Sequence, residues 1–234
     1  MLADELDAPV HIHLHENAEE VATSKSTHGA TPIARLDAIG LLTPRLQAVH
    51  MTAVDAPDLE RMATRGAAVV HCPQSNLKLG NGHCRLVDFL AAGIRVGLGT
   101  DGAASGNDLD LFDEAHTAAL LAKATTRDAG TMPAHTVLEL ATLGGARALG
   151  LDQQIGSVEP GKSADLIAID MSGAGAVPVH RPESTLLYGG AGRLVNHVWI
   201  DGRQIMHART LTTLDERAIV DRARIWAQRL AGNS

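Results

Sequence analysis

The regular alternation of short apolar segments with helical ones restricts the fold more than any other feature of the sequence. Four apolar segments in the first hundred residues are predicted as strands, at residues 10–15, 46–50, 67–72 and 94–99. Helices are expected between them, because Thr31-Pro32 is a typical helix start and Gly66 and Gly93 are typical helix ends. Near-continuous apolar strands of this kind are typical of parallel sheets covered by helices. The sequence therefore predicts an α/β fold.

The second half of the chain is predicted to change from long helices to short strands. The expected elements after the third strand are a loop at 74–82, helices from Asp108 or Asp110 to Ala124 and from Pro133 to Leu149, a strand at 163–170, a hairpin at 195–206 and a helix at 215–230. The hairpin turn is placed at Asp201-Gly202, a pair that is typical of two-residue turns. The change of character divides the chain near residue 150.

Composition is typical of a protein with one large core. The 234 residues are 45% hydrophobic, enough for one large domain with an appendage. The net charge of −7 is spread along the chain, and no basic cluster indicates a nucleic-acid partner. The sequence has neither an apolar run of ~18 residues nor a signal peptide, so we expect a cytoplasmic protein with no membrane partner. Cys72 and Cys84 match no common spacing of zinc ligands and are expected to be reduced.

Three histidines and a glutamate crowd together at the first predicted strand: His11, His13 and His15 lie in it, and Glu16 is expected to follow its end. Alternation along a strand would place the three histidines on one face and the apolar residues between them on the other. A row of imidazoles on one face is costly to bury unless a metal ion or an acid satisfies it. A lone histidine more often belongs to a core or a surface, but this cluster favours a metal site.

Two further predicted strands lead to residues that bind metals or move protons, His50 and Asp101. In barrels of parallel strands the active site lies at the carboxyl ends of the strands. Either residue alone would be interpreted as part of a loop or turn, since an Asp-Gly pair usually marks a turn. Their shared position with the histidine cluster predicts a catalytic centre.

Five motifs occur in order along the chain: His13–Glu16, Ala48–His50, His71–Leu79, Gly99–Ser105 and Ile155–Leu166. Together they resemble the amidohydrolase superfamily, and within it they look most like the 5-methylthioadenosine/S-adenosylhomocysteine deaminases, near the triazine hydrolases. Each motif alone is weak, but five in the family's order over essentially the whole chain are specific.

The resemblance implies a divalent metal, Zn²⁺ or another such as Fe²⁺, and a role for each residue of the predicted centre. His13 would be a metal ligand, and Asp101 would be both a ligand and the base. Glu16 would shuttle protons, and His50 would orient the metal-bound water and the polarised group. Glu16 and Asp101 would therefore also contact the substrate. Four further residues at the same mouth are candidate substrate contacts: Ser75, Asn76, Ser105 and Asn107.

The implied reaction is hydrolytic deamination of a small-molecule purine nucleoside, of the 5′-methylthioadenosine, S-adenosylhomocysteine or adenosine type. Zinc lowers the pKa of bound water to about 7. The resulting hydroxide would attack the ring carbon that bears the amine, and ammonia would leave. Glu16 would deliver a proton to the adjacent ring nitrogen, provided that an enclosed site raises its pKa.

The family fold is a (β/α)8 barrel with a small β-sandwich, and the histidine strand matches the fifth barrel strand. The resemblance implies that residues 1–150 form barrel strands 5 to 8, residues 151–213 part of the β-sandwich, and residues 214–234 a C-terminal helix. The family's His-x-His pair, on its first strand, is missing. Zinc normally has three or four protein ligands, so we expect weak zinc binding by the isolated chain. The expected protein partners are further copies of the chain in a homo-oligomer, or another chain that supplies the missing half of the barrel.

Two other interpretations stay open. Another hydrolase of the superfamily, such as a triazine chlorohydrolase or aminohydrolase or a guanine deaminase, would carry the same motifs, because specificity residues lie largely in the missing half. A protein of a different class, a non-catalytic truncated remnant, would bind no metal. Metal content separates the remnant from an enzyme, and a screen for ammonia release separates the enzymes.

Overall fold

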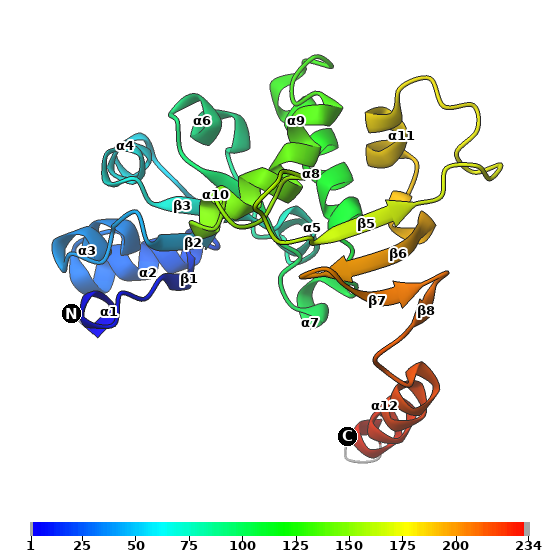
Figure 1. Cartoon of the computed structure of the whole chain (residues 1–234). Coiled ribbons are helices and arrows are strands. Elements are labelled where there is room, and N and C mark those ends of the chain that lie inside the picture. The colour runs from blue at the N-terminus through cyan, green and yellow to red at the C-terminus, as the bar shows by residue number, and fades with distance from the viewer. Residues whose placement is uncertain (1, 232–234) are drawn as a thin grey trace.

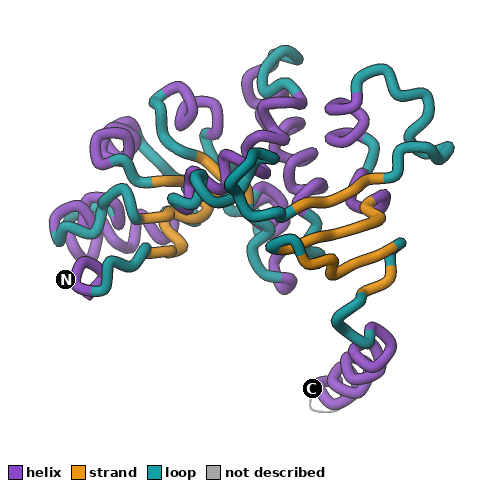
Figure 2. The backbone as a smooth tube through the Cα atoms, in the orientation of Figure 1, coloured by secondary structure: helices purple, strands orange, loops and turns teal. Residues whose placement is uncertain are grey.

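The computed structural model of the chain describes residues 2–231, which form two β-sheets flanked by helices (Figure 1). The strands are β1 (Val10–Leu14), β2 (Leu46–His50), β3 (Ala68–His71), β4 (Val96–Leu98), β5 (Leu166–Ile169), β6 (Val195–Ile200), β7 (Arg203–His207) and β8 (Thr210–Leu211). The first sheet has the order β1-β2-β3-β4 with parallel neighbours, and the second has the order β5-β6-β7-β8 with antiparallel neighbours. Figure 2 shows the two sheets as separate groups of strands.

Helices connect the parallel strands, as the sequence predicts, and further helices precede the first strand and follow the fourth. They are α1 (Leu2–Glu5), α2 (Ala18–His28), α3 (Pro32–Ala38), α4 (Ala56–Arg65), α5 (Pro73–Lys78), α6 (Leu86–Ala91), α7 (Ala103–Gly106), α8 (Leu111–Thr126), α9 (Ala134–Glu139), α10 (Gly145–Leu149), α11 (Pro182–Tyr188) and α12 (Glu216–Ala231). Because β1 to β4 are parallel, each connection returns the chain to the same starting edge. The carboxyl ends of the four strands therefore share one edge of the sheet.

Local capping signals begin and end the first crossover helices. The Thr31 side chain accepts a hydrogen bond from the N–H three residues later at the start of α3, and Asp55 does the same at the start of α4. Gly66 ends α4 in the left-handed conformation, with φ of 70°. Each side-chain cap contributes about 1 kcal/mol to a helix. The helix boundaries predicted from these residues are confirmed.

One face of the parallel sheet packs against the helices and forms the core. Ala48, Val69 and Val96 stand in register across three strands, and each is at most 2% exposed. Met62 of α4 and Phe89 of α6 belong to the same buried cluster. Burial of each large side chain of this kind contributes about 1.5–3 kcal/mol to folding. This face therefore supplies stability and leaves the other face free for other uses.

The opposite face of the sheet carries the candidate functional residues. His13, Val49, Val70 and Gly97 stand in register across the four strands. With Asp101 they line a cavity of about 290 Å³. The predicted centre thus opens onto a space that the core does not fill.

The helix expected from Pro133 to Leu149 is divided in the structure. A π-helical turn, Leu140–Gly144, separates α9 from α10. A Cβ atom at position 97 would lie 2.8 Å from the Cα of Gly145. Because Gly97 has no side chain, α10 can lie directly against β4. The π-helical turn and this close contact together place α10 beside the cavity.

The loop expected at 74–82 is wrong in its first half, because Pro73–Lys78 forms α5. Pro73 occupies the first helical turn, where its missing N–H leaves no bond unmade. Cys72, which precedes it, makes no capping hydrogen bond with its side chain. This stretch therefore has a proline at its first helical position but no side-chain cap to mark the start of the helix.

The second sheet and the last helix follow the prediction closely. Asp201 and Gly202 have φ values of 50° and 74°, as a two-residue turn between β6 and β7 requires. Every residue of α12 is exposed, and Figure 1 shows this helix standing away from both sheets. The sequence did not predict α11. Neither α12 nor any other helix within residues 2–231 is long and apolar enough to cross a membrane.

Candidate active site

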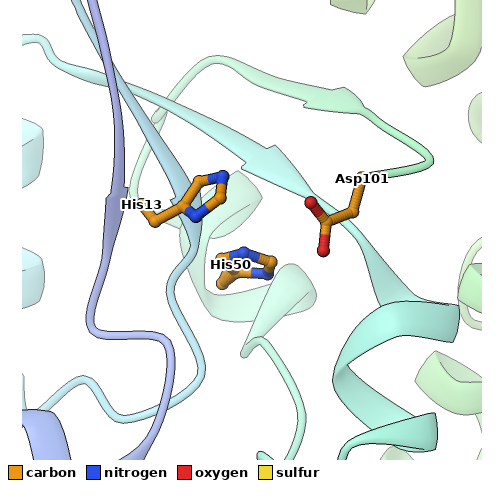
Figure 3. Close-up of side chains that lie close together, drawn as sticks. All are labelled: His13, His50 and Asp101. Atoms are coloured by element: carbon orange, nitrogen blue, oxygen red, sulfur yellow. The ribbon is translucent and has the colours of Figure 1, made fainter. Parts of the chain in front are cut away.

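Three side chains converge at the carboxyl end of the parallel sheet: His13 on β1, His50 at the end of β2 and Asp101 shortly after β4. Their possible ligand atoms all lie within 4.8 Å of one another. The rings of His13 and His50 meet edge to face, with centroids 4.9 Å apart. Figure 3 shows the three side chains pointing toward one another from β1, from the end of β2 and from the loop after β4. Residues 88 positions apart in the sequence thus form one cluster, at the edge where the strand pattern predicts it.

The backbone turns sharply where these strands end. His15, His50 and Asp101 have φ values of 49°, 75° and 56°, in the left-handed region that residues other than glycine rarely adopt. Such a conformation costs about 1–3 kcal/mol per residue and is concentrated at functional sites. The surrounding fold must hold these turns in place, and those at His50 and Asp101 accompany side chains that enter the cluster.

His50 is completely buried, and only one of its ring nitrogens has a partner. Its Nδ1 lies 2.8 Å from the amide Oδ1 of Asn76, which assigns the ring proton to Nδ1. Its Nε2 has no hydrogen-bond partner within residues 2–231. A buried acceptor without a partner is costly, so Nε2 is suited to meet a donor or a cation that enters the site.

Asp101 is held as a carboxylate. Burial on its own would raise its pKa, but hydrogen bonds from Ser75, Ser105 and the N–H of Gly102, together with the nearby His50, lower the pKa below the usual value. The Ser75 and Ser105 hydroxyls both donate to Oδ2, at 2.6 and 2.7 Å. The carboxylate therefore offers a fixed negative charge beside the two histidines.

Glu16 lies one residue beyond the turn at His15 and outside the three-residue cluster. Its Oε1 accepts a hydrogen bond of 3.0 Å from the amide of Asn81. Thr52 Oγ1 lies 2.7 Å from the carbonyl oxygen of Glu16 and so ties the turn to the end of β2. The expectation that β1 ends before Glu16 is confirmed, because the strand stops at Leu14.

The three histidines do not share one face, and that expectation is wrong. His15 is completely buried on a different side: its Nδ1 donates to the carbonyl of Ala53 at 2.7 Å, and its Nε2 accepts from the N–H of Ile33 at 3.2 Å. The left-handed turn at His15 breaks the alternation. His11 lies on the same face of β1 as His13, and both side chains line the cavity.

The four candidate substrate contacts differ in exposure. Ser75 and Asn76 are completely buried in α5, where their side chains contact Asp101 and His50. Ser105 is half-buried against Asp101, and the exposed Asn107 contacts Lys78 on α5. The structure therefore brings Ser75, Asn76 and Ser105 to the cluster and leaves Asn107 at its rim.

The chain as a whole matches one known protein family. The model of the amidohydrolase family covers residues 1–205. The chain belongs to the amidohydrolase family. The resemblance carried by the motifs around His13, His50 and Asp101 is thereby confirmed.

Relatives of this amidohydrolase include named enzymes. It is 48% identical over 228 residues to the 5-methylthioadenosine/S-adenosylhomocysteine deaminase of Teredinibacter turnerae, a match that covers 97% of this chain and 52% of the relative. An adenosine deaminase from Xanthomonas campestris with bound zinc is 48% identical and superposes with a TM-score of 0.96, over 99% of this chain and 53% of that one. The zinc complex of atrazine chlorohydrolase from Arthrobacter aurescens is 26% identical and superposes with a TM-score of 0.90, over 96% of this chain and 49% of that one. The chain thus spans about half the length of these relatives.

Sequence reasoning missed a buried acid next to the site of this amidohydrolase. Glu114, in the first turn of α8, is 1% exposed and accepts a hydrogen bond of 3.1 Å from the backbone N–H of Gln74. The pKa of Glu114 is raised to about 7, mainly by burial. The hydrogen bond from Gln74 lowers this pKa, and nearby acids such as Asp108 raise it. In the sequence, Glu114 is indistinguishable from the acids that commonly occupy a first helical turn. No local signal could have identified it.

Proposed function

We propose that this amidohydrolase carries the catalytic end of a hydrolytic deaminase for adenine-containing nucleosides. The convergence of His13, His50 and Asp101 within 4.8 Å carries the proposal. Two relatives at 48% identity support the choice of reaction, since they are named for deamination of 5-methylthioadenosine, S-adenosylhomocysteine or adenosine. The substrate is therefore a small molecule with an amino-substituted purine ring.

Zinc is the proposed cofactor, with another divalent metal such as Fe²⁺ as the alternative. His13 and Asp101 would hold it through an imidazole nitrogen and a carboxylate oxygen, both common zinc ligands. The residues fit a cation because the unpartnered Nε2 of buried His50 and the ionised Asp101 face one space. A bound zinc ion supplies Lewis acidity, which makes water available as a nucleophile near neutral pH.

Asp101 and Glu16 divide the proton transfers in the proposed mechanism. Water adds to the ring carbon that bears the amine, and Asp101 takes a proton from that water. Glu16 gives a proton to the adjacent ring nitrogen as the carbon becomes tetrahedral. Asp101 then passes its proton to the amine, Glu16 takes back the proton of the new hydroxyl group, and the carbon–nitrogen bond breaks so that ammonia leaves. One water is consumed, and the ring keeps its oxygen as a carbonyl group.

His50 and Asn81 orient the reacting groups. With its proton on Nδ1 held by Asn76, His50 presents Nε2 as an acceptor for a proton of the attacking water or of the substrate. The amide of Asn81 donates to Glu16 and holds its carboxyl group in one direction. Because these groups are already held in the reactive orientation, less entropy is lost on reaching the transition state, and the activation free energy is lower.

The proposed architecture is part of a (β/α)8 barrel. The four parallel strands with their helices, residues 1–150, are assigned to barrel strands 5 to 8. Residues 151–213 are assigned to part of a β-sandwich and residues 214–234 to a C-terminal helix, of which 232–234 lie outside the described residues. The relatives are about twice as long as this chain, which supports the assignment. The remaining barrel strands and metal ligands would lie in the other half of the family fold.

Three alternatives to this deaminase would give different experimental outcomes. A triazine hydrolase is favoured by the TM-score of 0.90 with atrazine chlorohydrolase, although the identity there is 26% against 48% for the deaminases. A guanine deaminase would share the same chemistry. A non-catalytic protein would leave the His13 and Asp101 cluster without a metal.

The test uses two proteins: this chain alone, and this chain joined to the amino-terminal half of the Xanthomonas campestris relative. The relative is a suitable donor because 99% of this chain superposes on it. Ammonia release is measured from 5′-methylthioadenosine, S-adenosylhomocysteine, adenosine and guanine, and chloride release from atrazine. We expect the zinc-loaded joined protein to release ammonia from the adenine nucleosides. Asp101→Asn should lower the rate at least about a hundredfold, whereas the exposed control Asp108→Asn should not.

The other outcomes overturn the proposal in distinct ways. Reaction with atrazine or guanine alone would assign the chain to one of the alternative hydrolases. Less than about 0.1 equivalent of zinc after reconstitution of the joined protein, with no turnover, would favour the non-catalytic alternative.

A further inference from the structure

Helix α5 holds two of the converging side chains through adjacent residues. The Ser75 hydroxyl donates to Asp101 at 2.6 Å, and the Asn76 amide oxygen lies 2.8 Å from Nδ1 of His50. Ser75 and Asn76 are both completely buried, so neither can choose another partner in solvent. Any shift of α5 would therefore move Asp101 and His50 together.

The amino end of α5 has no cap of its own. The helix spans six residues, and so short a segment is unstable without tertiary contacts. The Cys72 side chain makes no capping bond, and Pro73 has no N–H to offer. Gln74 is therefore the first residue of α5 whose N–H needs an acceptor.

Glu114 supplies that acceptor from another helix. Its Oε2 accepts the Gln74 N–H at 3.1 Å, from a position 40 residues further along the chain. The Gln74 side chain makes a second tie to α8, since its Nε2 lies 2.8 Å from Asp113 Oδ2 and 3.2 Å from Thr117 Oγ1. Both contacts pin the same end of α5, immediately before Ser75.

We propose that Glu114 is a positioning residue of the active site, which acts by fixing α5 and thereby the side chains of Ser75 and Asn76. This inference rests on the proposed function, because it concerns the groups assigned to the deamination reaction. Burial of a carboxyl group is costly and an apolar residue would be cheaper in a helix-packing role. The bond to Gln74 gives this buried acid a use that an apolar side chain could not fill.

The test follows the Nδ1 proton of His50 by NMR in the chain labelled with ¹⁵N-histidine, together with the zinc dissociation constant. Glu114→Leu removes the acceptor and should increase both the proton's exchange rate and the dissociation constant at least about tenfold. Glu114→Gln keeps an oxygen for the Gln74 N–H and should stay within about twofold. Glu114→Asp folds with its charge intact but falls short of Gln74, and should raise both values at least about threefold.

Two control variants separate positioning from loss of stability. Val137→Ala opens a cavity in the core at α9, away from α5, and should leave both values within about twofold. Gln74→Ala keeps the N–H that Glu114 accepts and removes only the side-chain tie to α8, so it should change both values less than Glu114→Leu does. Unchanged values in Glu114→Leu and Glu114→Asp, or equal changes in Val137→Ala, would overturn the proposal. The NMR result does not depend on turnover, so a protein that fails to deaminate would count against the proposed function alone.

Discussion

The two ends of the parallel sheet use polar groups in opposite ways. At the amino end, the guanidinium of Arg95 donates to the carbonyls of Pro44 at 2.6 Å, Gly66 at 2.8 Å and Arg147 at 2.8 Å. These carbonyls lie before β2, before β3 and on α10, so one side chain joins three parts of the fold. At the carboxyl end, the buried Nε2 of His50 has no partner within residues 2–231, and the chain adopts costly left-handed turns.

The amino end of the sheet thus stabilises the fold, whereas the carboxyl end, where the proposed reaction takes place, lowers its stability. Satisfied hydrogen bonds at the amino end contribute favourably, whereas strained turns and an unpaired acceptor at the carboxyl end lower the stability. Parallel barrels commonly divide stability and catalysis between their ends in this way. Substitutions at one end should therefore change activity without stability, and substitutions at the other should do the reverse.

The largest effect on activity is expected at Asp101. Asp101→Ala removes both a proposed ligand and the base, so kcat/KM of the zinc-loaded joined protein should fall at least about a thousandfold. Its free energy of unfolding without metal should fall by less than about 2 kcal/mol, because the loss of the hydrogen bonds from Ser75 and Ser105 is partly offset by removal of a carboxylate that burial disfavours. Urea unfolding followed by circular dichroism measures this. A large loss of stability would contradict the division between the two ends.

Glu16 should show a smaller but still selective effect. Glu16→Gln removes the proton donor and should lower kcat about a hundredfold or more, while KM stays within about threefold. Asn81→Ala only releases the Glu16 carboxyl group, so a decrease of about tenfold in kcat is expected. Steady-state kinetics on both variants gives these values, and an Asn81→Ala effect on KM alone would point to substrate binding instead.

At the amino end, Arg95→Ala should lower the free energy of unfolding by about 2–4 kcal/mol, because three backbone carbonyls lose a charged donor. The kcat of the protein that remains folded should stay within about twofold of the original value. Arg222→Ala, on the exposed helix α12, is the matched control and should change neither quantity. If Arg95→Ala lost activity in the folded protein, the two ends would not be independent.

The smallest effect concerns pH. Burial raises the pKa of Glu114 from 4.5 to about 7, so the folded chain binds this proton more tightly than the unfolded chain does. The free energy of unfolding should therefore fall as pH rises from about 4.5 to about 7 and then level off. Glu114→Gln removes this slope, and its stability relative to the original chain should be about 2–3 kcal/mol better at about pH 8 than at about pH 5. An unchanged slope would show that Glu114 does not titrate there.

Much of the parallel sheet could be predicted because its signals are local. The capping residues Thr31 and Asp55 and the left-handed Gly66 act within one helical turn, so their effect is visible in the sequence. The turn at Asp201-Gly202 is equally local. Placement of His13, His50 and Asp101 together also followed from the strand pattern, because carboxyl ends of parallel strands share one edge.

The features that were missed depend on distant contacts. Helix α5 lacks a local cap and is held by Glu114, which lies 40 residues beyond Gln74 in the sequence. His15 leaves the predicted face because its ring finds partners at Ala53 and Ile33 in other segments. No periodicity within one segment can reveal such partners, since they are brought together by the folded chain.

The most direct test of the account is anomalous diffraction at the zinc absorption edge from crystals of the zinc-loaded joined protein. We expect a single peak at the carboxyl end of the parallel sheet, about 2.0–2.2 Å from a ring nitrogen of His13 and a carboxylate oxygen of Asp101. His50 should lie beside it with Nδ1 still bonded to Asn76. A peak at another place, or none at this cluster, would contradict the proposed metal centre.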